Sequence, residues 1–414
     1  MGLPEGRDAA ADPGGSLLEG LVENSHLVAP DELPSLVARA AEAIEASEVV
    51  VYLVGYEQRV LTPLAGEGVP PREPLEVDHT LGGWAFRTVT VLRSGADDGE
   101  RLWVPMVDGT ARVGVMELTL AAVDDALEQR VRAFAGLVAT LVVTKDAYGD
   151  TLKLARRAEP MSVAAEMQWE LLPPLTFSDG RVTISGMLEP SYRVAGDTFD
   201  YALNDGCLHV AVIDAMGHGF EATVLATVAI GVYRHARRLG QGLAETYRAM
   251  DDAIVRQFGV DRFVTGQLVE LDTRTGLMRW LNAGHPKPLL TRGNTLVGPL
   301  ECAPTLPIGF GGAVAEIAEH QLQPGDRLVF VTDGVLEARS ADGEFFGENR
   351  LEDFVVRVTT AGLPAPETAR RLTHAVLDHQ DGQLQDDATT VFVEWVGRER
   401  ALPVGQAPPP TPSG

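Results

Sequence analysis

Acidic side chains stand at the ends of four apolar stretches in the second half of this chain. An aspartate where a buried strand ends is costly unless a positive group meets it. Any one of the four is typical of an ordinary turn, but four such strand ends indicate a shared function. Oxygen ligands without a Cys or His pattern among them suit Mg²⁺ or Mn²⁺ rather than zinc. The aspartates are Asp197, Asp214, Asp333 and the adjacent pair Asp386 and Asp387.

The segment around Asp214 has the clearest pattern. Val210–Ile213 predicts a buried strand that delivers Asp214 into the glycine-rich turn Ala-Met-Gly-His-Gly, and a helical pattern begins near Glu221. Glycines there would let a ligand approach the backbone closely. His218, in the same turn, either contacts or protonates a substrate or makes only a local hydrogen bond. His285, in Asn-Ala-Gly-His-Pro, is expected to shape a turn before a strand.

Composition limits the partners that the chain can have. Its 414 residues carry a formal net charge of -25, with 45% hydrophobic and 22% charged residues. No basic patch is available for nucleic acid or for an anionic membrane surface. With no secretion signal and no apolar run near ~18 residues, we expect a cytoplasmic protein that does not span a membrane. Cys207 and Cys302 lack metal-binding spacing and are expected to be buried, inert residues in a reducing compartment.

The first third predicts a small sensor domain over residues 30–140, after a disordered or helical segment at residues 1–29. Its order is a helix, two strands, a short helix, a strand hairpin and a long helix. The segment Gly-Trp-Ala-Phe and the hairpin Trp-Val-Pro-Met … Gly-Val-Met-Glu-Leu resemble those of a GAF sensor domain. The resemblance implies an α/β fold that binds a small molecule or dimerises.

A long helical stretch follows the sensor domain. Apolar residues from Leu127 to Ala155 follow a 4-3 spacing that Lys145 and Gly149 interrupt. This spacing favours a parallel coiled coil joining two protomers, and so a homodimer. The alternative is that Leu127–Val143 packs back on the sensor sheet. Residues 141–176 are predicted to form a helical linker, including a short switch helix over Ser162–Leu172.

Beyond residue 177 strands and helices alternate, up to a tail at residues 398–414 that is predicted to be disordered. Helices are expected near Glu221–Arg238, Leu243–Phe258, Leu351–Thr360 and Pro366–Gln380. The expected strands are Val182–Leu188, Thr198–Asn204, Leu208–Ile213, Thr265–Asp272, Leu277–Asn282, Lys287–Thr291, Arg327–Thr332 and Thr389–Trp395.

The motifs of this half, in order, resemble those of the SpoIIE/RsbU-type phosphatases, a bacterial branch of the metal-dependent type 2C (PPM) serine/threonine phosphatases. They include Ala-Glu-Met-Gln-Trp-Glu-Leu-Leu-Pro, Val-Ala-Gly-Asp-Thr-Phe-Asp, Val-Ile-Asp-Ala-Met-Gly-His-Gly, Asn-Ala-Gly-His-Pro, Phe-Val-Thr-Asp-Gly-Val and Asp-Asp-Ala-Thr. The resemblance covers about residues 160–396. It implies an α+β chain whose residues 177–397 form a β-sandwich flanked by helices, with two Mn²⁺ or Mg²⁺ ions at one end.

The same resemblance implies roles for individual residues. Asp197 and Asp214 would hold both metal ions, with the backbone carbonyl of Ala215 as a further ligand. The remaining ligands would be Asp333 and Asp386, with Asp387 adjacent; the spacing slightly favours Asp386 as the direct ligand. Ala195 stands where the first glycine of the Gly-Gly-Asp motif is usual, and Ala215-Met216 replaces the common Val-Ser or Gly-Met, but neither change removes a metal contact. Two such ions would activate a water molecule for in-line attack on phosphorus.

The implied activity is hydrolysis of phosphoserine or phosphothreonine on a protein. By analogy with the family, the substrate would be an anti-sigma-factor antagonist in a partner-switching pathway, with the sensor domain as regulator. The rival hypothesis is a catalytically weak sensor or scaffold that uses the fold to bind a partner. The complete set of aspartates argues against that rival, and the net charge disfavours a metal-dependent nuclease.

Overall fold

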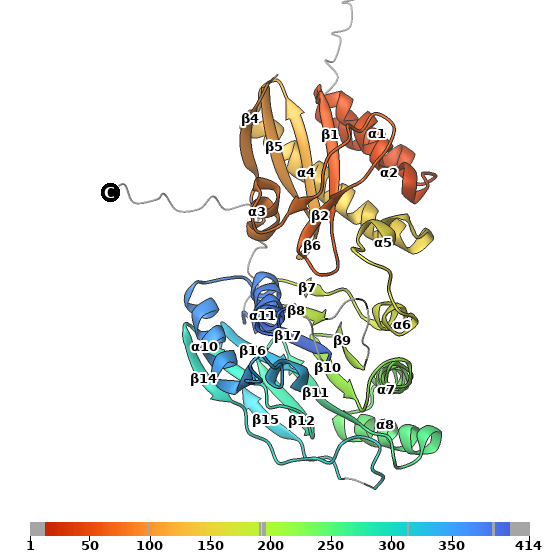
Figure 1. The fold of residues 1–414 in the computed structure, drawn as a ribbon, viewed down its shortest axis with the longest axis vertical. Helices are drawn as coiled ribbons and strands as arrows, with labels where there is room; N and C mark the ends of the chain where they lie inside the picture. The colour runs from red at the N-terminus through yellow and green to blue at the C-terminus, as the bar shows by residue number, and fades with distance from the viewer. Residues whose placement is uncertain are drawn as a thin grey trace, which may run out of the picture. The chain divides into compact units, whose positions relative to one another are not determined.

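The computed structural model describes residues 13–97, 99–189, 192, 196–312, 314–382 and 386–397. The chain folds as two compact units, with the division between Ala158 and Glu159 (Figure 1). The disorder expected for the first residues and for the tail after Gly397 lies outside the described residues, except that a helix begins at Pro13. None of the helices within the described residues has the length and apolar character needed to cross a membrane.

The N-terminal unit is built on one antiparallel sheet of six strands. The predicted hairpin is its centre, because Trp103 pairs with Glu117 and Val104 with Met116. Side chains alternate between the two faces of these strands, so each face has its own apolar cluster. In sheet order the strands are β3 (Leu75–Glu76), β2 (Val60–Pro63), β1 (Glu48–Val54), β6 (Ala111–Leu120), β5 (Gly99–Asp108) and β4 (Leu92–Ala96).

Helices cover both faces of this sheet. On one face α1 (Pro13–Ser25), α2 (Leu33–Ala41) and α4 (Asp125–Lys145) share one core with the strands. On the other face α3 (Leu81–Thr88) packs beside Tyr52 and Trp103. Thr80 caps α3, because its hydroxyl accepts a hydrogen bond from the Gly83 amide at 3.0 Å.

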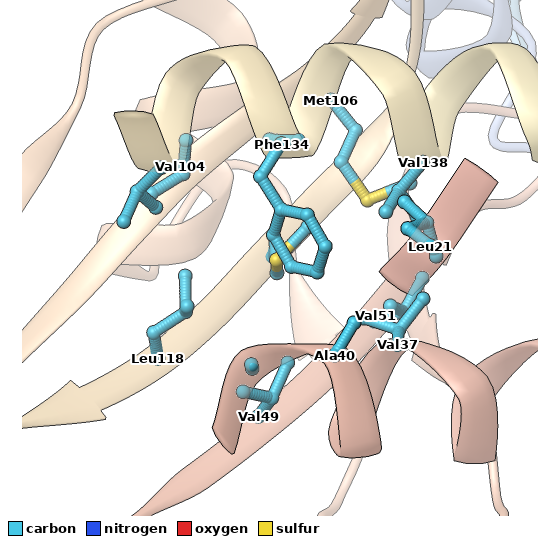
Figure 2. Close-up of a cluster of buried hydrophobic side chains, with 14 of the residues drawn as sticks. Leu21, Val37, Ala40, Val49, Val51, Val104, Met106, Leu118, Phe134 and Val138 are labelled. Atoms are coloured by element: carbon cyan, nitrogen blue, oxygen red, sulfur yellow. The ribbon is translucent and has the colours of Figure 1, made fainter. Parts of the chain in front are cut away.

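The predicted coiled-coil seam is wrong for α4. Val131, Phe134 and Val138 are fully buried against the sheet of their own unit, as Figure 2 shows for Phe134 and Val138 beside Met106. The helix also ends at Lys145, and a separate helix, α5 (Thr151–Ala155), begins after an extended glycine. The 4-3 spacing therefore marks the face of α4 that packs on the sheet, which was the alternative interpretation.

The C-terminal unit is a sandwich of two antiparallel sheets. Their facing sides enclose an apolar core that includes Val210, Phe330 and Val391. One sheet has the order β15 (Ala318–Gln321), β12 (Leu277–Ala283), β11 (Val264–Asp272), β10 (Cys207–Ala215) and β9 (Asp197–Asn204). The other has the order β14 (Thr295–Pro299), β13 (Leu289–Arg292), β16 (Asp326–Val331), β17 (Ala388–Trp395), β8 (Val182–Glu189) and β7 (Thr176–Ser178).

Helices cover the outer face of each sheet. The helices α7 (Phe220–Arg238) and α8 (Leu243–Phe258) bury Ile230 and Tyr247 against the five-stranded sheet. The helices α10 (Gly347–Thr360) and α11 (Ala365–His379) pack on the six-stranded sheet. Two further short helices are α6 (Val163–Leu171), which the sequence predicts, and α9 (Asp333–Leu336), which it does not.

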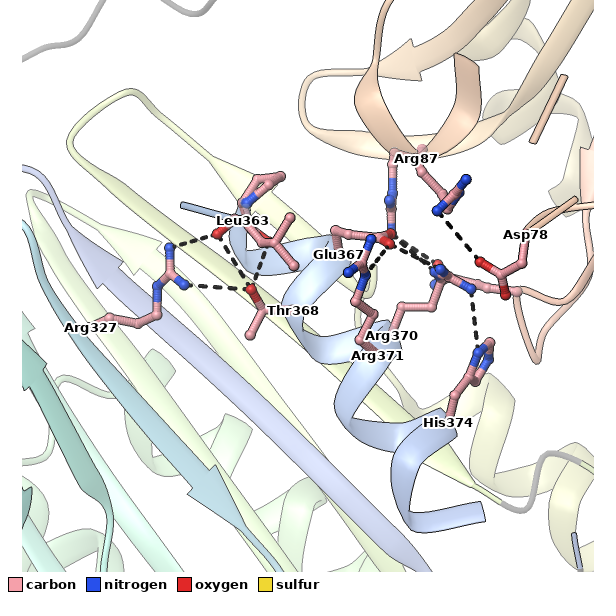
Figure 3. A network of polar contacts seen from close by, with 12 residues as sticks. Asp78, Arg87, Arg327, Leu363, Glu367, Thr368, Arg370, Arg371 and His374 are labelled. Atoms are coloured by element: carbon pink, nitrogen blue, oxygen red, sulfur yellow. Dashed lines mark hydrogen bonds and ion pairs between the residues drawn. The ribbon is translucent and has the colours of Figure 1, made fainter. Parts of the chain in front are cut away.

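Polar contacts fix α11 to the six-stranded sheet. The guanidinium of Arg327, on β16, donates to the carbonyl of Leu363 at 3.1 Å and to the hydroxyl of Thr368 at 3.5 Å (Figure 3). Within α11 the Glu367 carboxylate accepts hydrogen bonds from Arg370 at 2.9 and 3.0 Å. The Arg327 contacts join the start of β16 to the beginning of α11, whereas the Glu367–Arg370 contacts lie within the helix.

All eight strands predicted for this unit are present, with ends shifted by one or two residues. One end that moves by two residues is the start of β13, which lies at Leu289 rather than Lys287. Pro286 and Pro288 lie just before it and cannot donate ladder hydrogen bonds, so the strand begins after them. The unpredicted strands β7, β14 and β15 have three to five residues and lie at sheet edges, where the alternation of apolar residues is weak.

Candidate functional site

Two of the predicted site residues lie directly across from each other in the five-stranded sheet. The antiparallel register of β9 and β10 pairs Asp197 with Asp214. The pairing continues past the strand end, because the Ala215 amide donates to the Gly196 carbonyl at 3.2 Å. Asp197 is only 2% exposed, whereas Asp214 is half-buried. The backbone of β10 then turns through Gly217, whose φ of 92° is in the left-handed region that favours glycine.

A threonine joins this pair to the other sheet. Thr332, at the end of β16, donates its hydroxyl hydrogen to the Asp197 carboxylate at 2.6 Å. The same hydroxyl oxygen accepts a hydrogen bond from the Thr389 amide of β17 at 3.0 Å. Since Thr332 is fully buried, this relay fixes the Asp197 carboxylate relative to both sheets. The next residue, Asp333, is exposed at the start of α9.

The pair Asp386 and Asp387 has one exposed and one buried member. Asp387 is 3% exposed, and its Oδ2 accepts a hydrogen bond from the Asp197 amide at 3.1 Å. Asp386 is exposed, and its carboxylate accepts from the Asp387 amide at 2.9 Å. A Cβ at Gly334 would lie 1.8 Å from the Asp387 carbonyl oxygen. Only glycine therefore allows the backbone after Asp333 to approach this loop.

Burial and neighbouring charges raise the pKa of four of these carboxyl groups. Burial raises the pKa of Asp214 to about 7, and the charges of Asp333, Asp386 and Asp387 add to the effect. Burial likewise raises the pKa of Asp387 to about 7. Burial and the charges of Asp214 and Asp387 raise the pKa of Asp197 well above its ordinary value. The pKa of Asp333 is raised by desolvation of its carboxyl group and by the charge of Asp386, although the residue as a whole is exposed. Five carboxylates are thus held at one end of the sandwich against their mutual repulsion.

The donor set suits a hard divalent cation. All candidate ligands are oxygen atoms, and Asp387 Oδ1 is buried without a hydrogen-bond partner. A cation would satisfy that oxygen and remove the repulsion within the cluster. As they stand, however, no three His, Cys, Asp or Glu side chains within the described residues are arranged to enclose a metal ion. The residue types therefore suit a divalent cation. The side chains as they stand do not surround a single point.

Gln168 is a site residue that the sequence analysis did not identify. It lies on α6, is 2% exposed, and its Nε2 donates to the Asp197 carbonyl at 2.5 Å. Its Oε1 is buried without a partner. The end of α6 is also tied to α7, because Arg234 donates to the Leu171 carbonyl at 2.7 Å. The predicted switch helix thus contacts the backbone of a candidate ligand directly. A glutamine on a short amphipathic helix gives no sequence signal for this contact.

Asp200 belongs to the same motif as Asp197 but is not part of the cluster. It is buried and accepts hydrogen bonds from Arg234 at 2.7 Å and from Arg237 at 2.6 Å. This buried ion-pair group holds β9 against α7. The two aspartates of this motif therefore have different roles. Asp197 belongs to the carboxylate cluster, and Asp200 forms ion pairs that hold β9 against α7.

The two histidines of interest have different surroundings. His218 is exposed in the turn after Asp214. His285 is buried, its amide donates to the Asn282 side chain at 2.7 Å, and its Nδ1 lies 3.0 Å from the Thr265 hydroxyl. Burial lowers the pKa of His285 to about 3, so it is neutral. His285 thus shapes the turn before β13, as the sequence predicts.

The cysteines are half-buried rather than fully buried, which corrects the sequence prediction. Burial raises the pKa of the Cys207 thiol to about 11 and also raises that of Cys302. Neither cysteine is a thiolate near neutral pH, so neither is an activated nucleophile.

Comparisons with known proteins report what this part of the chain is similar to. Residues 204–396 match the family described as Stage II sporulation protein E (SpoIIE). Protein IcfG of Synechocystis is 24% identical over 268 residues, which are 56% of this chain but only 39% of that protein. Phosphoserine phosphatase RsbU of Bacillus subtilis is 20% identical over 56% of this chain and 69% of its own length. The solved SiaA-PP2C domain of Pseudomonas aeruginosa is 21% identical, with a TM-score of 0.47, over 56% of this chain and 94% of that domain.

Proposed function

We propose that this chain is a divalent-cation-dependent phosphatase acting on phosphoserine or phosphothreonine in proteins, because residues 204–396 match the SpoIIE family. The observation that carries the proposal is the meeting of aspartates from both sheets at one end of the sandwich. Asp197 connects them, since it pairs with Asp214 and bonds to Thr332 and Asp387. The similarity to a protein named phosphoserine phosphatase supports the choice of substrate group.

We assign the ligands as follows. Asp197, Asp214 and the backbone carbonyl of Ala215 would hold two Mn²⁺ or Mg²⁺ ions, and Asp333, Asp386 and Asp387 would complete the set. When bound, such ions supply charge for the phosphoryl oxygens and a water of lowered pKa. The protein's own part is to hold the carboxylates in place. Thr332 and Gln168 fix the side chain and the backbone of Asp197, respectively.

Regulation by the N-terminal unit is part of the proposal. We infer that this unit acts as a GAF-like sensor and that α6 transmits its state. The support is local: Gln168, on α6, bonds to the Asp197 backbone, so a shift of α6 would move a ligand. An allosteric effect requires only ~1–3 kcal/mol. A homodimer also remains part of the proposal, through a surface other than the buried face of α4.

We further propose that the protein acts in the cytoplasm on an anti-sigma-factor antagonist, or on a similar small phosphoprotein of a partner-switching pathway. The experiment that tests the activity is phosphate release from p-nitrophenyl phosphate and from a phosphoserine protein, with Mn²⁺, with Mg²⁺ and with chelator. Cation-dependent release from the wild type, abolished in Asp333→Asn, is the expected result. A folded protein that releases no phosphate with either ion would instead be a scaffold that binds its partner.

A further inference from the structure

A groove is formed by the turn after β10, the start of α7 and the end of α8. It has a volume of about 340 Å³. Leu225 is fully buried at its floor, while Met216 and Phe220 are 41% and 56% exposed. Figure 1 shows α7 and α8 side by side on the five-stranded sheet. We name it the α7–α8 groove, and its lining residues are Met216, Phe220, Glu221, Val224, Leu225, Phe258 and Arg262.

The groove and the carboxylate cluster are connected by the turn that follows Asp214. Met216 lines the groove and is the second residue after Asp214, at the end of β10. The Met216 amide donates to the Phe263 carbonyl at 3.1 Å, so the turn and the segment after α8 are joined. A molecule whose phosphate reaches the carboxylate cluster would place its neighbouring groups at this groove.

Beside the groove, a loop around Gly309 lies against the backbone of Arg262. The Asp251 carboxylate, which is buried on α8, accepts hydrogen bonds from the amides of Gly309 at 2.7 Å and Gly311 at 3.1 Å. Between these glycines Phe310 packs against Phe263, with ring centroids 5.1 Å apart. These contacts tie the loop that lies against Arg262 to α8.

One ion pair stands at the rim. The Arg262 guanidinium lies 2.6 Å from the Glu221 carboxylate, and the two side chains are 40% and 78% exposed. Arg262 is the only basic residue of the groove lining within the described residues. Its Nη1 lies 3.8 Å from where a Cβ of Gly217 would stand, so it reaches the turn after Asp214. An exposed pair of this kind contributes little stability, so Arg262 can exchange Glu221 for another anion at low cost.

We propose that the α7–α8 groove binds the phosphorylated segment of the protein substrate. A large apolar side chain next to the phosphoserine would enter the groove between Phe220 and Val224. Arg262 would leave Glu221 and contact the phosphate, for which a planar guanidinium is well suited. Apolar walls and a single cation match a phosphorylated peptide with an apolar flank. This inference rests on the proposed phosphatase function and specifies its substrate class.

The test compares fluorescent phosphoserine peptides in which leucine or alanine flanks the phosphoserine. Binding is measured by anisotropy in the presence of chelator, and phosphate release is measured with Mn²⁺. The wild type should bind the leucine peptide about tenfold more tightly, since a buried apolar side chain provides discrimination of at least this order. Phe220→Ala and Val224→Ala should remove the preference. Val297→Ala is the matched control, because Val297 is exposed on β14 outside the groove.

The two failures are distinguishable. Equal binding of both peptides by the wild type, or an unchanged preference in a Phe220→Ala protein that melts cooperatively, would overturn the groove proposal. A binding preference without phosphate release from any substrate would leave the groove in place and overturn the phosphatase function. Because Phe220 is 56% exposed, its replacement is compatible with folding.

The rim pair gives a second test, with effects in opposite directions. The gain in affinity that the phosphate adds to the leucine peptide should fall severalfold in Arg262→Gln. It should rise in Glu221→Gln, which frees Arg262. If neither substitution changes the difference between the phosphorylated and unphosphorylated peptides, Arg262 does not contact the phosphate.

Discussion

Asp214→Asn should stabilise the protein in the absence of metal ions and abolish its cation-dependent phosphatase activity. The pKa of Asp214 rises from 3.8 to about 7 in the folded protein, because of burial and neighbouring carboxylates. A rise of this size corresponds to about 4 kcal/mol of desolvation and charge repulsion once the group is ionised. Asp214 is only half-buried, so solvent reduces this, and we expect roughly 1–2 kcal/mol.

The sign of the effect depends on pH. Between pH 3.8 and about 7 the folded state holds the Asp214 proton more tightly than the unfolded chain does, so wild-type stability falls as pH rises through that window. Asparagine does not titrate. The stability advantage of Asp214→Asn should therefore be small near pH 4 and complete near pH 8.

Urea unfolding with chelator at pH 5 and pH 8 measures this advantage, with Asp252→Asn as the matched control, because Asp252 is exposed on α8. Added Mn²⁺ should then stabilise the wild type but not the variant, because a ligand stabilises only the state that binds it. A variant less stable than wild type at pH 8 would refute the argument from repulsion. Near-wild-type turnover at saturating Mn²⁺ would refute Asp214 as a ligand.

Three further outcomes are expected. Gln168→Ala should lower turnover at least severalfold while costing about 1–3 kcal/mol of unfolding free energy, because it leaves the Asp197 carbonyl unpaired; kinetics and urea melts measure both. Replacing Cys207 and Cys302 together by serine should leave turnover unchanged, since neither thiol ionises near neutral pH; loss of activity in a cooperatively melting variant would favour thiol chemistry. Because His285 is buried and neutral, only the unfolded chain takes up a proton at this residue between pH 7 and pH 5. The free energy of unfolding of the wild type should therefore fall by about 2 kcal/mol over that range, and urea melts of His285→Gln should show a correspondingly smaller fall.

Much of the C-terminal unit could be predicted because its strands and helices bury one regular face. Leu243–Phe258 is helical as expected, and β12 and β17 differ from their predicted ranges by one residue. The position of the candidate site was predictable for the same reason, since Asp214 and Asp333 follow apolar strands. However, the residue types at a strand end do not reveal how deeply each side chain is buried. The spacing favours Asp386 as a ligand, whereas the structure buries Asp387 and leaves Asp386 exposed.

The wrong prediction for α4 has a physical cause. A 4-3 spacing states which face of a helix is apolar, but not which surface covers that face. Val131 and Val138 would fit a partner helix as well as they fit the sheet, and only the tertiary structure decides between them. The role of Gln168 could not be predicted for a different reason. It depends on a single long-range hydrogen bond to Asp197, which leaves no periodic pattern in the sequence.

The acidity of the chain and the α7–α8 groove have a common consequence for substrate selection. A net charge of -25 repels a phosphorylated partner at a distance, so long-range attraction does not bring the substrate to the site. At physiological salt, charges beyond about 8 Å are largely screened, which leaves contacts at the surface to decide binding. Near the carboxylate cluster those contacts are the apolar side chains of Met216 and Phe220 and the guanidinium of Arg262. Under the proposed function, a phosphoprotein would therefore be selected by short-range contacts at the groove rather than by long-range attraction.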